Sequence, residues 1–122
     1  MRITIATVLL AITAGCTTLS VGPEEESLCG PRPSEAQARD AVQVYIDRVG
    51  LKDPSSAQVR DVRVADRAKW YKGLINGGGY NYGWEISFQL NAKNSFGAYI
   101  GFKDRKVLLA PGGMVQWRME IE

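Results

Sequence analysis

Two neighbouring side chains could together form a catalytic pair. Lys93 and Ser95 stand in the run Asn-Ala-Lys-Asn-Ser-Phe-Gly, and a lysine amine can activate a serine hydroxyl as a nucleophile. They lie only two positions apart, however, and the sequence contains no S-x-x-K pattern and no obvious oxyanion-stabilising element after them. A small envelope hydrolase that uses Ser95 and Lys93 is therefore the alternative hypothesis for this chain.

Composition argues against several other kinds of site. The chain has no histidine, which removes the commonest general base and the commonest metal ligand. Two cysteines are too few for a thiolate zinc site. The net charge of +2 is small, and no basic cluster is interleaved with aromatic residues along a helix, so we expect no nucleic-acid partner. We also expect no metal and no cofactor.

The same polar run has two interpretations. Asparagine and serine side chains can bond their own backbone and stabilise an irregular turn, which explains most of the motif. A turn does not require Lys93, so the competing interpretation is a polar pocket or partner-binding surface. The candidate residues of that surface are Asn91, Lys93, Asn94, Ser95 and Tyr99.

A second group of candidate binding residues is aromatic. Trp70, Tyr71 and Tyr80 lie on either side of three successive glycines, Gly77–Gly79. One interpretation is a long hairpin whose aromatic tip meets a glycan or a peptide. The other is that the rings cover the end of a sheet and the glycines only turn the chain. The glycines do not form a phosphate loop, because no Gly-Lys-Ser/Thr element and no helix follow them.

One amphipathic helix is predicted over residues 34–49. Ser34 and Gln37 fit a capping box, and Gly50 can end the helix in the left-handed conformation. Apolar residues recur at three- and four-residue spacing, which predicts a face that covers a core. These residues are Ala38, Ala41, Val42, Tyr45 and Val49.

Strand patterns follow the helix. Trp84, Ile86, Phe88 and Leu90 alternate with polar residues, the period-two pattern of a half-buried strand. With its expected partner strand, this forms a hairpin over 82–102, and Lys103–Lys106 is expected to be a charged turn. The predicted strands are 59–65, 82–90, 98–102, 107–110 and 115–122. The fold class is therefore α+β, one N-terminal amphipathic helix packed on an antiparallel sheet of about five sequential strands, with Tyr45, Trp84 and Phe88 in one core.

Residues 1–16 have the features of a signal peptide. A positive start is followed by an apolar segment too short to span a bilayer, and Thr13-Ala14-Gly15-Cys16 comes next. This resembles the lipobox of bacterial lipoproteins, whose cysteine is acylated, although that family usually has leucine where Thr13 stands. Ordinary secretory cleavage is the alternative. By the same resemblance, the absence of aspartate after Cys16 implies the outer membrane, facing the periplasm.

Residues 17–33 are expected to be a flexible tether, since they are rich in Gly, Pro and Glu and have no apolar period. Cys29 lies within them. It is expected to be a tolerated surface thiol, with pairing between molecules as the alternative. Residues 34–122 are expected to form a single domain.

The run Leu51–Ala57 and the hairpin motif Asn91–Gly101 together resemble a group of small, uncharacterised bacterial envelope lipoproteins. These carry an L-K-D-P-x-S-A segment before an N-x-K-N-S-[FY]-G-x-Y-x-G hairpin, and the resemblance covers about half of the mature chain. Members often have a cysteine just before the asparagine motif, and Trp84–Leu90 contains none. The resemblance implies a shared fold and supplies no activity.

These observations favour a non-catalytic envelope lipoprotein, a binding or assembly module of unidentified process. The expected partners are the membrane, through acyl chains on Cys16 that include palmitate, and a protein or a glycan. Stable anchoring needs more than one acyl chain, which a triacylated cysteine provides.

Overall fold

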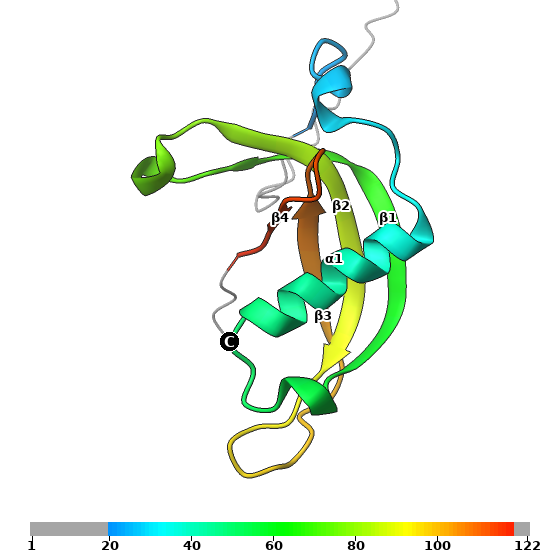
Figure 1. Ribbon diagram of the computed structural model, residues 1–122, viewed down its shortest axis with the longest axis vertical. Coiled ribbons are helices and arrows are strands. Elements are labelled where there is room, and N and C mark those ends of the chain that lie inside the picture. The colour runs from blue at the N-terminus through cyan, green and yellow to red at the C-terminus, as the bar shows by residue number, and fades with distance from the viewer. Residues whose placement is uncertain (1–19, 119–122) are drawn as a thin grey trace, which may run out of the picture.

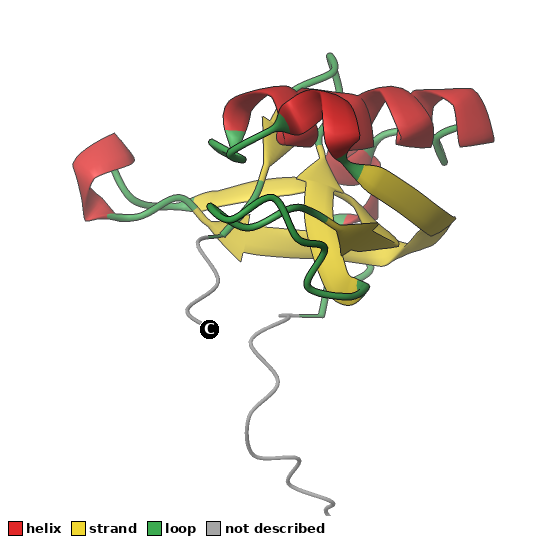
Figure 2. Cartoon of the chain, turned by 90° about the horizontal axis from the view of Figure 1, so that it is seen from below, coloured by secondary structure: helices red, strands yellow, loops and turns green. Residues whose placement is uncertain are grey.

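The computed structural model describes residues 20–118, in which one helix lies across one face of a four-stranded antiparallel sheet (Figures 1 and 2). The α+β prediction is confirmed, while the described residues form four strands where about five were predicted. The strands follow each other in the order β1-β2-β3-β4. The elements are a 3-10 helix η1 (Glu26–Cys29), α1 (Glu35–Arg48), η2 (Pro54–Ser56), β1 (Gln58–Tyr71), η3 (Leu74–Asn76), β2 (Tyr80–Asn91), β3 (Lys103–Leu109) and β4 (Val115–Gln116).

Helix α1 begins as the sequence predicts. Ser34 caps it, and the Ser34 hydroxyl accepts a hydrogen bond from the Gln37 backbone while the Gln37 side chain accepts one from the Ser34 backbone. The capping box satisfies two backbone donors that have no partner within the helix. After the cap residue Val49, Gly50 adopts φ 88°, the left-handed conformation expected there.

Strand β1 is longer than predicted. It continues through residues 66–71 and forms a long antiparallel hairpin with β2. Two register irregularities interrupt it, between Arg60 and Arg63 and between Val64 and Arg67. Asp61 has φ 56° within the first. Each irregularity changes which side chains face the helix, so no single period-two pattern runs through β1 and its second half is hidden from sequence inspection.

The prediction for the partner strand of β2 was wrong. Residues 98–102 lie in a loop, and β3 occupies Lys103–Leu109, where a charged turn was expected before a short strand. Leu90 pairs with Lys103 and Asn91 pairs with Gln58, so residues 92–102 project beyond the paired strands. Ile100 is 49% exposed, which shows that the alternating apolar residues of this segment do not face a core. Of the predicted last strand, Val115 and Gln116 form β4 and residues 119–122 lie outside the described residues.

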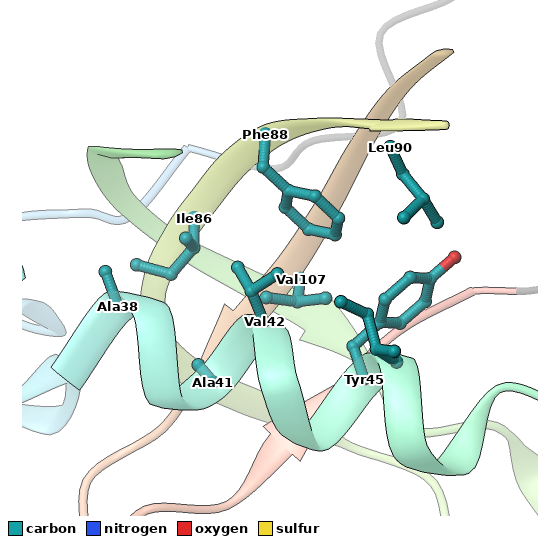
Figure 3. Close-up of a cluster of buried hydrophobic side chains, with 9 residues drawn as sticks. Ala38, Ala41, Val42, Tyr45, Ile86, Phe88, Leu90 and Val107 are labelled. Atoms are coloured by element: carbon teal, nitrogen blue, oxygen red, sulfur yellow. The ribbon is translucent and has the colours of Figure 1, made fainter. Parts of the chain in front are cut away.

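The main core lies between α1 and the sheet (Figure 3). The Tyr45 and Phe88 rings meet edge to face, with centroids 5.5 Å apart. The helix contributes Ile46 in addition to its predicted face, whereas Val49 is only partly buried. The buried members are Ala38, Ala41, Val42, Tyr45, Ile46, Ile86, Phe88, Leu90 and Val107.

Trp84 is buried as predicted, but in different surroundings. Its indole N–H donates to the Gly30 carbonyl at 3.2 Å. The guanidinium groups of Arg32 and Arg67 lie 5.5 and 4.8 Å from its ring centre. Trp84 therefore packs with the segment that precedes α1 and not with the cluster around Phe88.

The segment before α1 differs from the expected tether. Glu25 contacts Lys69 and Tyr82 of the sheet, and Arg32 donates to the Val64 carbonyl at 3.0 Å. Cys29 is 2% exposed, so the expectation of a surface thiol was wrong. Burial also raises the pKa of the Cys29 thiol. From Glu25 onward the expected tether is therefore part of the folded domain.

Candidate functional site

Asn94 organises the tip of the loop between β2 and β3. Its side-chain oxygen accepts hydrogen bonds from the backbone N–H groups of Phe96 and Ala98, at 2.9 and 3.1 Å. The Asn94 N–H donates to the Ala98 carbonyl, and Gly97 closes the turn with φ 81°. The side chain replaces backbone partners within the turn, so Asn94 acts in the architecture of the loop.

Asn91 holds the base of the same loop. It is 8% exposed, its side-chain oxygen accepts from the Gly101 N–H at 3.0 Å, and its amide donates to Gln58 at 3.1 Å. One side chain thus joins the end of β2 to the returning chain and to the start of β1. The turn interpretation of the asparagine motif fits both asparagines.

Lys93 and Tyr99 face each other across the loop. An isolated antiparallel bridge joins their backbones, and the Lys93 amine lies 5.3 Å from the centre of the Tyr99 ring. The Tyr99 hydroxyl donates to the Ser56 carbonyl in η2 at 2.9 Å, which fixes the loop against the segment after α1. In that segment, the Ser55 hydroxyl holds the pKa of Asp53 below its usual range, and the positive charge of Lys93 lowers it further.

Lys93 also lines an open pocket of about 290 Å³. Four further positive charges reach it, and among its described lining residues none is acidic; the cationic residues are Lys52, Lys103, Arg105 and Arg118. We call this site the basic pocket. Its apolar lining consists of Tyr45, Val49, Leu51, Leu90, Ala92 and Ile100. Such a lining can hold an anionic group that is attached to an apolar portion.

Ser95 does not form a catalytic pair with Lys93 in the described part of the chain. The Ser95 side chain is exposed at the loop tip and no hydrogen bond joins it to Lys93. A general base has to come within hydrogen-bond reach of the hydroxyl it activates. The Lys93 amine lies instead over Tyr99 and beside Asp53.

The aromatic candidates lie at the other end of the sheet. Tyr80 begins β2 and Asn91 ends it, so the structure does not bring the two candidate groups together (Figure 1). Trp70 is 4% exposed, and its indole donates to the buried Glu85 carboxylate at 3.0 Å on the face away from α1. Trp70 therefore covers the sheet. Tyr71 and Tyr80 form an edge-to-face pair, with centroids 5.8 Å apart, that stays partly exposed.

A second open pocket, of about 350 Å³, has a mainly apolar lining. Cys29, Pro31 and Pro33 from the chain before α1 line it together with residues of α1 and of the turn between β3 and β4. Sequence inspection missed this pocket and also the contributions of Lys52, Lys103, Arg105 and Arg118 to the basic pocket. Lys103 and Arg105 were read as part of a charged turn, and no local signal indicates that they approach Lys93.

No protein-family model matches the chain, and no curated protein and no solved structure shows significant similarity to it. Within residues 20–118, no group of acidic and cysteine side chains could hold a metal ion. Nor does any helix in that part of the chain have the length and apolar character needed to cross a bilayer.

Proposed function

We propose that this protein is a lipid-anchored protein of the bacterial outer membrane, facing the periplasm, whose domain binds a partner without catalysing a reaction. The anchor is supported by the apolar segment that ends at Ala14-Gly15-Cys16, which lies outside the described residues. The burial of Cys29 supports Cys16 as the acylated residue, because a buried thiol is not available for acylation. Cys16 then remains as the anchoring residue.

The basic pocket is the observation that carries the binding role. Five cationic side chains surround an apolar lining, and the asparagine turn holds one of them, Lys93, in place. This arrangement suits a protein segment that carries carboxylates beside apolar side chains. A glycan fits less well, because sugars stack on exposed aromatic faces and Tyr45, the one aromatic residue in the described lining, is only 5% exposed.

Two measurements test the proposal. In fractionated cells, Cys16→Ser should move the protein from the membrane to the soluble envelope fraction, and unchanged membrane association would refute the anchor. A pull-down from detergent-solubilised envelopes should recover an acidic protein partner, whose binding weakens as salt rises. Recovery of a glycan in its place would overturn the choice of ligand.

A further inference from the structure

The turn between β1 and β2 presents two large apolar side chains to the outside. We call residues 72–79 the hairpin tip. Within it, Leu74 is 85% exposed and Ile75 is 100% exposed. Figures 1 and 2 show that this hairpin extends well away from the rest of the sheet, so neither side chain has a core to join.

The hairpin tip is a closed turn. The Lys72 N–H donates to the Gly79 carbonyl at 2.9 Å, and the Asn76 side chain donates to the Lys72 carbonyl at 3.1 Å. Gly73 and Gly77, with φ 88° and 86°, flank the 3-10 turn that carries Leu74 and Ile75. The backbone thus holds the two adjacent apolar side chains together at the outermost point.

The residues behind the hairpin tip follow the order found at a membrane interface. The partly exposed rings of Tyr71 and Tyr80 lie at the base of the hairpin tip, and the exposed Lys72, the first residue of the tip, is next to Tyr71 in the chain. Amphipathic rings and cations gather at the headgroup level of a bilayer, where apolar side chains reach past them toward the acyl chains. Lys69, over the Tyr80 ring, adds a second amine further along β1.

The chain before α1 puts the hairpin tip within reach of the anchor. Glu25 contacts Lys69 at 3.1 Å, and five residues of extended chain from Lys69 to Leu74 span at most about 17 Å. Cys16 precedes Ser20, the first described residue, by four positions, which span at most about 14 Å. An acylated Cys16 therefore keeps the domain close to the bilayer.

From these observations we infer that the hairpin tip is a second membrane contact, which inserts Leu74 and Ile75 at the boundary between headgroups and acyl chains. The inference rests on the proposed lipid anchor. We choose a lipid surface over a protein as the partner of the hairpin tip, because the anchor places a bilayer within its reach. The domain would then stand on the bilayer with the basic pocket, at the other end of β2, turned away from it.

Site-specific fluorescence on the full lipidated protein in vesicles of phosphatidylethanolamine and phosphatidylglycerol tests this contact. Ile75→Cys is labelled with an environment-sensitive fluorophore. Phe96→Cys is the matched control, because Phe96 is 95% exposed at the tip of the loop at the opposite end of β2. The unsubstituted protein, treated with the same fluorophore, measures the background labelling of the buried Cys29. Melting curves check that both variants fold.

The probe at position 75 should shift to the blue in vesicles and lose intensity when the lipids carry a quencher, while the probe at position 96 should do neither. A water-exposed probe at position 75 on protein that floats with the vesicles would overturn this inference and leave the anchor intact. A blue shift without lipid quenching would mean that the hairpin tip contacts a second copy of the protein, and quenching at both positions would mean adsorption without orientation. Either result would overturn this inference. Protein that does not float with vesicles would overturn the anchor and this inference together.

Discussion

The Tyr82 hydroxyl donates a hydrogen bond to the Glu25 carboxylate at 2.6 Å, joining two residues that are 57 positions apart. The Lys69 amine contacts the same carboxylate at 3.1 Å. Through this contact the segment before α1 is attached to both strands of the long hairpin. The contact also determines where the folded domain begins, and therefore how far it can stand from an anchor at Cys16.

The contact should depend on pH. The hydrogen bond from Tyr82, with the further bond and charge of Lys69, lowers the pKa of Glu25. A lowered folded-state pKa gives stability that is present above the ordinary carboxyl pKa of about 4.3 and is lost as the pH falls through the folded-state value. The melting temperature of Glu25→Gln should therefore fall less steeply with acid than that of the unsubstituted protein. Glu24→Gln is the control, and equal slopes for all three proteins would contradict the prediction.

At alkaline pH the stability that the same contact gives changes in the opposite direction with pH. The hydrogen bond to Glu25 raises the pKa of Tyr82, so the stability it gives is complete below the ordinary tyrosine pKa and is lost as the pH rises through the folded-state value. Tyr82→Phe should remove that alkaline loss.

The core prediction concerns Phe88, which is 2% exposed and packs on the edge of Tyr45. Phe88→Ala should lower the free energy of unfolding by about 3–5 kcal/mol, because it removes apolar contacts and leaves a cavity between α1 and the sheet. Denaturant unfolding followed by circular dichroism measures the loss. A loss below about 1 kcal/mol would mean that the ring does not fill the core.

Local signals explain what sequence inspection found in this fold. The capping box of Ser34 and Gln37 is made by residues three apart, so the start of α1 is visible in the sequence. β3 was misplaced because Ala98, Ile100 and Phe102 imitate a strand pattern, whereas the true register depends on the pairing of Leu90 with Lys103. Trp84 contacts Gly30 and Arg32, which precede it by more than 50 residues, and no periodicity in the sequence predicts contacts between residues so far apart.

Two glycines should be needed for different reasons. A Cβ on Gly83 would collide with the Leu109 carbonyl oxygen, whereas one on Gly97 would meet nothing within 4 Å. Gly83→Ala should destabilise the domain by about 1–3 kcal/mol, because β2 and β3 must separate. Gly97→Val should lose more than about 1 kcal/mol through its φ of 81° alone.

Asparagine at each position separates the two causes, since it tolerates a positive φ and still carries a Cβ. Gly97→Asn should keep most of the stability and Gly83→Asn should not. Thermal melting of the four variants gives the comparison. Equal losses for Gly97→Asn and Gly97→Val would show that backbone strain is not the reason for Gly97.

Only one residue of the basic pocket could be predicted from the sequence. The asparagine motif pointed to Lys93 as the residue that a turn does not require, and the structure places it in a pocket wall. Lys52 follows α1, Lys103 and Arg105 lie on β3, and Arg118 follows β4. The other cations therefore come from segments that only the fold brings together. For the same reason, the buried hydrogen bond of Trp70 with Glu85 could not be predicted, and the sequence left Trp70 open between a ligand-binding ring and a ring that covers the sheet.

Lys93→Ala separates binding from stability in the pocket. Its contact with the Tyr99 ring is partly exposed, and such contacts contribute about 0.5–1 kcal/mol, so the melting temperature should change little. Binding of an acidic partner should weaken, and the salt dependence of that binding should become shallower because one positive charge has left the site. Lys106→Ala is the matched control, since Lys106 pairs with Ser87 and its exposed side chain belongs to the other face of the sheet. If Lys93→Ala melts the domain as severely as Gly97→Val, the lysine is a structural contact of the loop. If Lys106→Ala weakens binding equally, the affinity depends on the overall charge of the domain and the basic pocket is not the binding site.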